Sequence, residues 1–226
     1  MLPKLGVIFD AGTGMFRVRD LIETDTLDIF MSHVHLDHSV GLTFLYDVLF
    51  EKEMSRVTVH VARDKIDTIK NHLYNEQLFP VKPNFEIREL SETPIELADG
   101  SKISSFPLKH PGGCRGYRID WPDRSLAYVT DTTAHADAEY IKSITGVSTL
   151  LHECNFPDGW EDRAEMTGHS CLTPVAEVAA AANAGQLYLV HVNPLNEGES
   201  PLDLNTVSAI YEKPTFVATD QLVIDV

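Results

Sequence analysis

The segment FMSHVHLDHSVGL, at positions 30–42, places His33, His35, Asp37 and His38 within six positions. Neutral imidazoles and carboxylates are preferred ligands of borderline divalent metals. Buried together without a cation, these groups would compete for protons and leave polar atoms unpaired. In this spacing the first and third residues can face one way, and the fifth and sixth another. The segment therefore predicts metal binding, and two neighbouring ions suit the spacing better than one.

Two coordination shells need further ligands, and three candidates follow apolar, strand-like segments. His110 ends ISSFPLKH, Asp131 ends SLAYVTD, and His191 ends LYLVH. The carboxyl ends of strands are where a sheet presents functional groups. Each residue alone carries little weight, but together they supply the ligands that the segment at 33–38 lacks.

Strand and helix patterns alternate around these residues. Apolar, β-branched strands are expected within 5–12, 27–32, 57–62, 85–90, 102–110, 117–121, 125–131, 148–154, 186–192 and 214–226, and helices within 39–53, 63–75, 136–145 and 173–185. Thr173 is the expected N-cap of the last helix, and Gly185 is expected just past its end. Strands paired with helices in both halves predict an α/β sandwich of two sheets, in one domain over residues 1–226.

The composition limits the kinds of partner that we expect the chain to bind. Lys and Arg number 18 against 34 Asp and Glu, a net charge of −16. A large nucleic-acid interface is disfavoured because phosphate neutralisation needs a basic face, although a local basic patch stays open. No apolar run approaches the roughly 20 residues of a membrane span, so no membrane partner is expected. The N-terminus lacks a signal-peptide layout, and three cysteines without metal-type spacing suit reduced thiols, so we expect a cytoplasmic protein.

The order of SHVHLDH, His110, Asp131 and His191 resembles the metallo-β-lactamase superfamily over nearly the whole chain. Within it, PLKHPGGCRGYRID, TDT, LLHECNF, GHS and LYLVHVNP resemble ribonuclease Z and its relatives. That branch also holds small phosphodiesterases of the carbon–phosphorus lyase pathway. The resemblance implies a four-layer αβ/βα sandwich. We expect a shortened N-terminal sheet, because few residues precede the strand-like segment that ends in Asp-Ala-Gly.

The resemblance also implies roles for individual residues. His33, His35 and His110 would hold one metal, Asp37, His38 and His191 the other, and Asp131 would bridge both. Zinc is the first expectation, with manganese and iron as alternatives. The ions would activate a hydroxide for attack on phosphorus, which gives Asp37 a catalytic as well as a ligand role. His169, in GHS, is the candidate general acid, since histidine changes its charge nearest to neutral pH. A purely structural role beside the following helix is the alternative for His169.

Other residues receive weaker assignments. His152 and Glu153 lie at a strand end and are candidates for orienting His169, although their roles stay open. Asp10 is interpreted as part of a tight turn. The remaining histidines, His60, His72 and His135, are interpreted as surface or packing residues.

The leading interpretation is a metal-dependent hydrolase, a phosphodiesterase acting on small or short anionic substrates. His110 and Asp131 are only 21 positions apart, which leaves no room for the long arm with which ribonuclease Z usually grips tRNA. The alternatives are a carboxylic ester or lactone hydrolase on the same scaffold, a ribonuclease Z-like nuclease, and a non-catalytic metal-binding protein. Relatives in the branch commonly pair, so a homodimer is expected.

Overall fold

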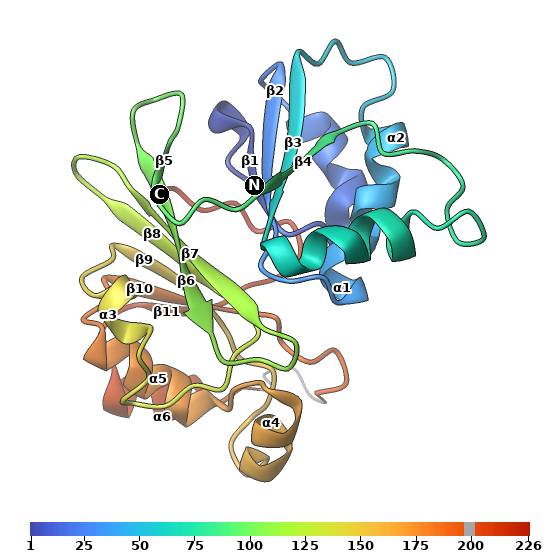
Figure 1. The fold of residues 1–226 in the computed structure, drawn as a ribbon. Coiled ribbons are helices and arrows are strands. Elements are labelled where there is room, and N and C mark those ends of the chain that lie inside the picture. Colours follow the sequence, from blue (N-terminus) through green and yellow to red (C-terminus); the bar gives the residue numbers. More distant parts are fainter. Residues whose placement is uncertain (197–201) are drawn as a thin grey trace. The chain divides into compact units, whose positions relative to one another are not determined.

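The computed structural model describes residues 1–196 and 202–226 (Figure 1). The chain divides into two compact units, each with one β-sheet. Unit 1 comprises residues 1–93 and 97–99, and unit 2 comprises residues 94–96 and 100–226. The prediction of a mixed α/β fold with two sheets is confirmed. A single domain over 1–226 stays a prediction, and one cooperative unfolding transition would support it.

Unit 1 contains a parallel sheet with the strand order β1-β2-β3-β4. Its strands are β1 (Val7–Phe9), β2 (Thr26–Phe30), β3 (Arg56–Val61) and β4 (Glu86–Glu89). The helical segments of this unit are α1 (Leu36–Ser39), α2 (Leu45–Val48), 3₁₀ segments at Pro3–Leu5, Thr13–Leu21, Val40–Phe44 and Arg63–Lys65, and a π-helical turn at Thr68–Leu73. Parallel neighbours end at the same edge of a sheet, so the residues that follow β1 and β2 come together there.

The helix expected over 39–53 is interrupted, and the loop after β1 explains why. The amide of Gly41 donates to the carbonyl oxygen of Ala11 at 2.7 Å, and the amide of Ala11 donates to the carbonyl oxygen of His38 at 2.8 Å. The Gly41 amide is therefore diverted from the helical hydrogen-bond ladder. A side chain on Gly41 would come within 2.6 Å of the Ala11 carbonyl oxygen, so this close approach requires glycine.

Unit 2 contains a sheet with the strand order β11-β10-β9-β8-β7-β6-β5. Its strands are β5 (Ile95–Glu96), β6 (Lys102–Leu108), β7 (Cys114–Asp120), β8 (Ser125–Val129), β9 (Thr149–Glu153), β10 (Gln186–Val190) and β11 (Thr215–Val217). The pairs from β5 to β8 are antiparallel, and those from β8 to β11 are parallel. The carboxyl ends of β8, β9 and β10 consequently lie side by side.

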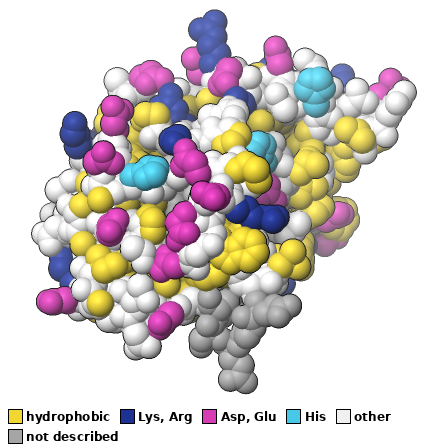
Figure 2. All heavy atoms as spheres, turned by 90° about the horizontal axis from the view of Figure 1, so that it is seen from below, with side chains coloured by type: hydrophobic (Ala, Val, Ile, Leu, Met, Phe, Trp, Pro, Cys, Tyr) yellow, Lys and Arg dark blue, Asp and Glu magenta, His cyan; other side chains and the backbone are white. Residues whose placement is uncertain are grey.

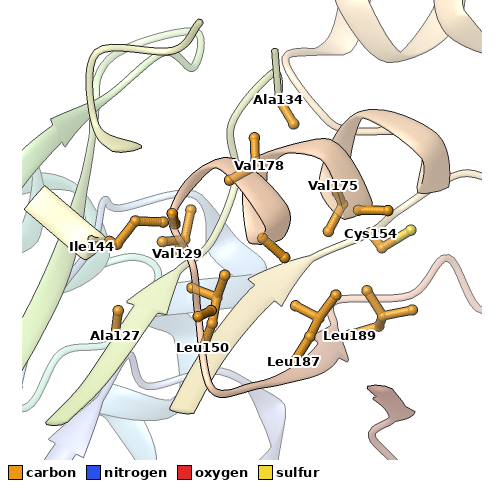
Figure 3. Packing of buried hydrophobic residues seen from close by; sticks show 14 of the residues in the cluster. Ala127, Val129, Ala134, Ile144, Leu150, Cys154, Val175, Val178, Leu187 and Leu189 are labelled. Carbon is orange, nitrogen blue, oxygen red and sulfur yellow. The ribbon is translucent and has the colours of Figure 1, made fainter. Parts of the chain in front are cut away.

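The helices of unit 2 are α3 (Ile141–Ile144), α4 (Glu161–Thr167), α5 (Leu172–Ala181) and α6 (Leu204–Ile210). The helix α5 buries Val175 and Val178 against Leu150 and Leu187 of the sheet (Figure 3). Burial of this apolar stripe of α5 drives the packing of the helix on the sheet and holds β9 and β10 in place.

Two details of unit 2 differ from expectation. The helix α5 begins at Leu172, so Thr173 is not its N-cap: the Thr173 amide and hydroxyl both donate to Asp158, each at 2.8 Å. The helix also ends at Ala181, so Gly185 stands nearer the start of β10 than the helix end. Both differences arise from packing and hydrogen bonds that residue type alone does not encode.

Two further expectations concern membranes and thiols. In the described part of the chain, no helix has the length and apolar character that crossing a membrane requires. All three cysteines are buried thiols. Burial raises the pKa of the Cys171 thiol to about 11 and raises that of Cys154 well above its usual value. Both thiols are therefore protonated and unreactive at neutral pH.

Candidate metal centre

Unit 1 gathers four ligand-type side chains after β2. The ring of His33 lies 4.5 Å from that of His35 and 4.3 Å from that of His38, measured between centroids. Asp37 Oδ2 lies 3.4 Å from His38 Nε2. The residues His33 and His38 are buried, whereas His35 and Asp37 are exposed. Within this unit, His33 with His35 and Asp37 with His38 each bring ligand atoms within 4.8 Å of one another.

The carboxylate of Asp10 orients this cluster. It follows β1, and it accepts from the Ser32 amide at 2.7 Å, from the Ser32 hydroxyl at 2.8 Å and from His38 Nδ1 at 2.9 Å. Because the Ser32 hydroxyl gives its one proton to Asp10, it accepts from His33 Nδ1, 2.9 Å away. Both imidazoles therefore carry a proton on Nδ1 and a lone pair on Nε2. The sequence interpretation of Asp10 as part of a turn overlooked this role.

Unit 2 gathers a second cluster around Asp131, which follows β8. Asp131 Oδ2 lies 3.7 Å from His110 Nε2, and Asp131 Oδ1 lies 3.4 Å from His191 Nε2. The side chains of Asp131 and His110 are each only 2% exposed. The two oxygens of one buried carboxylate thus face two different imidazoles, which is the orientation that a bridging carboxylate needs.

The imidazole of His110 is fixed by the end of α4. His110 Nδ1 donates to the carbonyl oxygen of Gly168 at 2.8 Å, and a carbonyl oxygen can only accept, so Nε2 keeps the lone pair. Gly168 adopts a φ of +77°, and a side chain there would come within 2.9 Å of His110 Nδ1. Glycine is therefore required both for the left-handed turn and for the approach to His110.

Asn155 holds the third member of the unit 2 cluster. Its side-chain nitrogen lies 3.2 Å from both the carbonyl oxygen and Nδ1 of His191. The carbonyl oxygen of Asn155 accepts from the amide of Asn193 at 3.2 Å. His191 has a φ of +54°, a left-handed conformation that a non-glycine residue keeps only when its surroundings impose it. Nothing in the sequence motifs identified Asn155 as a partner of His191.

His169 stands beside the unit 2 cluster. Its ring centroid lies 5.2 Å from that of His110 and 5.4 Å from that of His191. Its Nδ1 lies 3.2 Å from Oε1 of Glu153, a carboxylate that is fully buried at the end of β9. Glu153 also accepts from the amides of Thr132 and Asn155, each at 3.0 Å. The same carboxylate therefore positions His169 and the backbone next to Asp131.

His152 faces away from His169. Its Nε2 lies 2.8 Å from the Tyr140 hydroxyl, and its Nδ1 donates to the carbonyl oxygen of Glu153 at 2.7 Å. Burial lowers the pKa of His152, so this imidazole is neutral in the folded chain. His152 is consequently a packing residue, and of the pair at 152–153 only Glu153 contacts His169.

The other histidines lie outside the two clusters. His60 stacks on Phe30 at 4.5 Å and lies 2.7 Å from Asp28 through Nε2. His72 and His135 are exposed. These positions agree with the sequence interpretation.

The donor set of each unit fits a divalent metal. Imidazoles and carboxylates suit zinc, manganese and iron, and metal-bound histidines typically donate their other ring nitrogen to a carboxylate or carbonyl oxygen. His38 and His110 show that pattern, with Asp10 and Gly168 as the acceptors. The chemistry of both clusters therefore matches metal binding by Nε2.

A family model described as the Beta-lactamase superfamily domain matches residues 6–192. This chain belongs to the β-lactamase superfamily. Its matches to proteins named ribonuclease Z confirm the resemblance that its motifs predicted.

Curated relatives carry the name ribonuclease Z. The protein of Synechococcus sp. (strain CC9605) is 32% identical over 219 residues, which are 93% of this chain and 61% of the relative. The protein of Halobacterium salinarum (strain ATCC 29341 / DSM 671 / R1) is 31% identical over 143 residues, which are 63% of this chain and 42% of the relative. In these matches the chain spans less than two thirds of the relative's length.

Solved structures confirm the predicted metallo-β-lactamase fold. YhfI from Bacillus subtilis has a TM-score of 0.77 at 16% identity, covering 96% of this chain and 85% of that protein. Human tRNase Z, short form, has a TM-score of 0.71 at 19% identity, covering 97% and 87%. A diphosphatase from the PhnP family has a TM-score of 0.70 at 20% identity, covering 96% and 77%.

Proposed function

We propose that this chain is a metal-dependent hydrolase that cleaves phosphodiesters. The observation that carries the proposal is the buried carboxylate of Asp131, whose oxygens face His110 and His191 separately. Relatives named ribonuclease Z and a PhnP-family diphosphatase support phosphorus chemistry. When bound, a pair of divalent ions supplies an activated water and neutralises the phosphoryl oxygens.

The ligand assignment keeps the pattern of the superfamily. By resemblance to that superfamily, His33, His35 and His110 would hold one ion, Asp37, His38 and His191 would hold the other, and Asp131 would serve both. The use of both clusters for the same two ions rests on the resemblance, and metal stoichiometry tests it. Zinc is the first candidate, with manganese and iron as alternatives. Two divalent ions against two aspartates leave a charge of about +2, which attracts an anionic substrate despite the acidic surface.

His169 supplies the proton that the leaving oxygen needs. The buried Glu153 carboxylate accepts from Nδ1 and stabilises the ring when it is doubly protonated, so Nε2 is the nitrogen that donates. Asp37 is exposed beside His38 and keeps its dual assignment as ligand and catalytic residue.

Small phosphodiesters are the proposed substrates. Most of the interval between His110 and Asp131 belongs to β7 and β8, which form antiparallel neighbours, so no long arm emerges there. On the face that Figure 2 shows, Lys and Arg side chains of the described residues are scattered among acidic and hydrophobic ones. Precursor tRNA processing is the second candidate, favoured by the names of the curated relatives.

A substrate panel tests the proposal. Metal-loaded protein should hydrolyse bis(p-nitrophenyl) phosphate, lose activity with a chelator and regain it with zinc or manganese. Turnover of a lactone panel without phosphodiester turnover would favour the ester or lactone alternative. Specific 3′ cleavage of precursor tRNA at physiological salt would favour the nuclease. Absence of turnover on all three in metal-loaded protein would indicate a non-catalytic metal-binding role.

The homodimer and the cytoplasmic location remain part of the proposal. Sedimentation at micromolar concentration measures the first, and a monomer there would contradict it. Localisation of the tagged chain in its own cell measures the second.

A further inference from the structure

An aromatic ladder leads away from His169 within unit 2. The buried ring of Phe156 lies 6.4 Å from the His169 imidazole, with the ring planes 70° apart. On Phe156 stacks the indole of Trp160, with centroids 6.2 Å apart and planes within 14°. Trp160 is 50% exposed. Half of the Trp160 side chain therefore reaches solvent, and its ring centroid lies no farther from that of His169 than the sum of these two centroid distances.

The ladder is held in place by the backbone around it. The Phe156 amide donates to the carbonyl oxygen of Ser170 at 3.1 Å, which ties this segment to the residue after His169. The Trp160 carbonyl oxygen accepts from the amide of Ala164 at 2.9 Å in the first turn of α4. The backbone that carries both rings is thus fixed by hydrogen bonds.

A cation accompanies the indole. The guanidinium carbon of Arg163 lies 5.9 Å from the Trp160 ring centroid, and Arg163 is exposed. An aromatic face beside an arginine, close to a phosphoryl-transfer site, matches the two parts of a nucleotide: a flat base and a phosphate.

We propose that Trp160 is a stacking platform for the base of a nucleotide substrate, with Arg163 facing its phosphate or ribose. The inference rests on the proposed function, since it adds a residue that determines specificity, Trp160, to the same site. Every base presents a π face, so such a platform selects nucleotides over simple diesters without reading sequence.

Fluorescence tests the platform without metal or turnover. The chain has two tryptophans, and Trp121→Phe leaves Trp160 as the single indole reporter. In metal-free Trp121→Phe protein, adenosine 5′-monophosphate should quench the emission in a saturable way, whereas ribose 5-phosphate should not. Equal effects of the two ligands, or none from either, would overturn the proposal.

Kinetics tests the selectivity. Thymidine 5′-(p-nitrophenyl) phosphate and methyl p-nitrophenyl phosphate share a leaving group, and the first carries a nucleoside where the second carries a methyl group. Trp160→Ala should lower kcat/KM about tenfold for the thymidine ester, mainly through KM, and leave the methyl ester within about twofold. Trp160→Phe should retain most of the preference because it keeps an aromatic face.

A matched control lies in the same unit. Trp121 also has an arginine over its ring, because the guanidinium carbon of Arg124 lies 5.0 Å from the ring centroid. However, Trp121 precedes β8 and Asp131 follows it, so the two residues lie at opposite ends of this strand. Trp121→Ala should leave the preference unchanged. If Trp160→Ala fails to fold by circular dichroism, Trp160→Phe and the quenching experiment decide.

The outcomes separate this inference from the proposed function. Normal hydrolysis of both esters with no change of preference in Trp160→Ala would overturn the platform and leave the phosphodiesterase proposal standing. Saturable quenching by adenosine monophosphate without hydrolysis of either ester would support base binding and reject the phosphodiesterase.

Discussion

Removing the His169 imidazole should slow the chemical step and leave the metals in place. The ring lies 5.2 Å from that of His110 and 5.4 Å from that of His191, and its Nδ1 is engaged by Glu153. General acid catalysis is worth about 10²–10⁴-fold, so His169→Ala should lose that factor in kcat for an alkyl phosphodiester. The loss corresponds to about 3–5 kcal/mol of barrier.

The leaving group provides the internal control. p-Nitrophenolate departs with little need for a proton, whereas an alkoxide needs one, so the loss in His169→Ala should shrink for bis(p-nitrophenyl) phosphate. Glu153→Gln keeps the side-chain shape and removes the charge that stabilises the doubly protonated ring. Glu153→Gln should therefore lose less kcat than His169→Ala, and its loss should likewise be smaller for the p-nitrophenyl ester than for the alkyl ester. The assay is steady-state turnover of both substrates with metal content measured on the same samples.

Two results would refute this reasoning. If His169→Ala loses metal, the residue is a ligand and the assignment of the shells is wrong. If kcat is unchanged for both good and poor leaving groups, the histidine has only a structural role.

Three further outcomes follow from the contacts. Asp10→Asn should weaken metal binding about 10–100-fold, measured by competition with a chelating dye, because the carboxylate that fixes His38 Nδ1 is lost. Asn155→Ala should weaken metal binding similarly by freeing the left-handed His191, and unchanged affinity would contradict the positioning role. Burial lowers the pKa of His152, so the unfolded chain binds a proton there that the folded chain does not. The stability from this residue is present above about pH 6.5 and is lost as the pH falls. In His152→Gln, denaturant titrations below that pH should show a slope shallower by up to about 1.4 kcal/mol per pH unit.

The strands and the polar residues that follow them could be predicted from the sequence because two signals coincide there. Strands such as β2, β8 and β10 are short apolar runs, and each ends just before a candidate ligand, His33, Asp131 and His191 respectively. The apolar run reflects burial of the strand, and the polar residue after it reflects the chemistry of the site. Both signals lie within a few consecutive residues, so they can be recognised in the sequence.

Contacts between segments that are distant in the chain could not be predicted from the sequence. Asp10 reaches Ser32 and His38, and Asn155 reaches His191, across 22 to 36 positions. Short polar residues in turns have many local uses, so their type alone does not indicate a distant partner. The break in the helix at Gly41 has the same origin, because the Gly41 amide donates to the carbonyl oxygen of Ala11, in the loop after β1.

The measurement closest to the central claim is the metal stoichiometry of the purified chain and of Asp131→Ala. Elemental analysis after loading and desalting should give two divalent ions per chain for the wild type and a clear loss for Asp131→Ala, with unchanged circular dichroism. Asp123→Ala, at an exposed carboxylate of the same unit, should retain both ions. A wild-type chain that holds no divalent metal after loading, or an Asp131→Ala variant that holds two ions as tightly, would contradict the account.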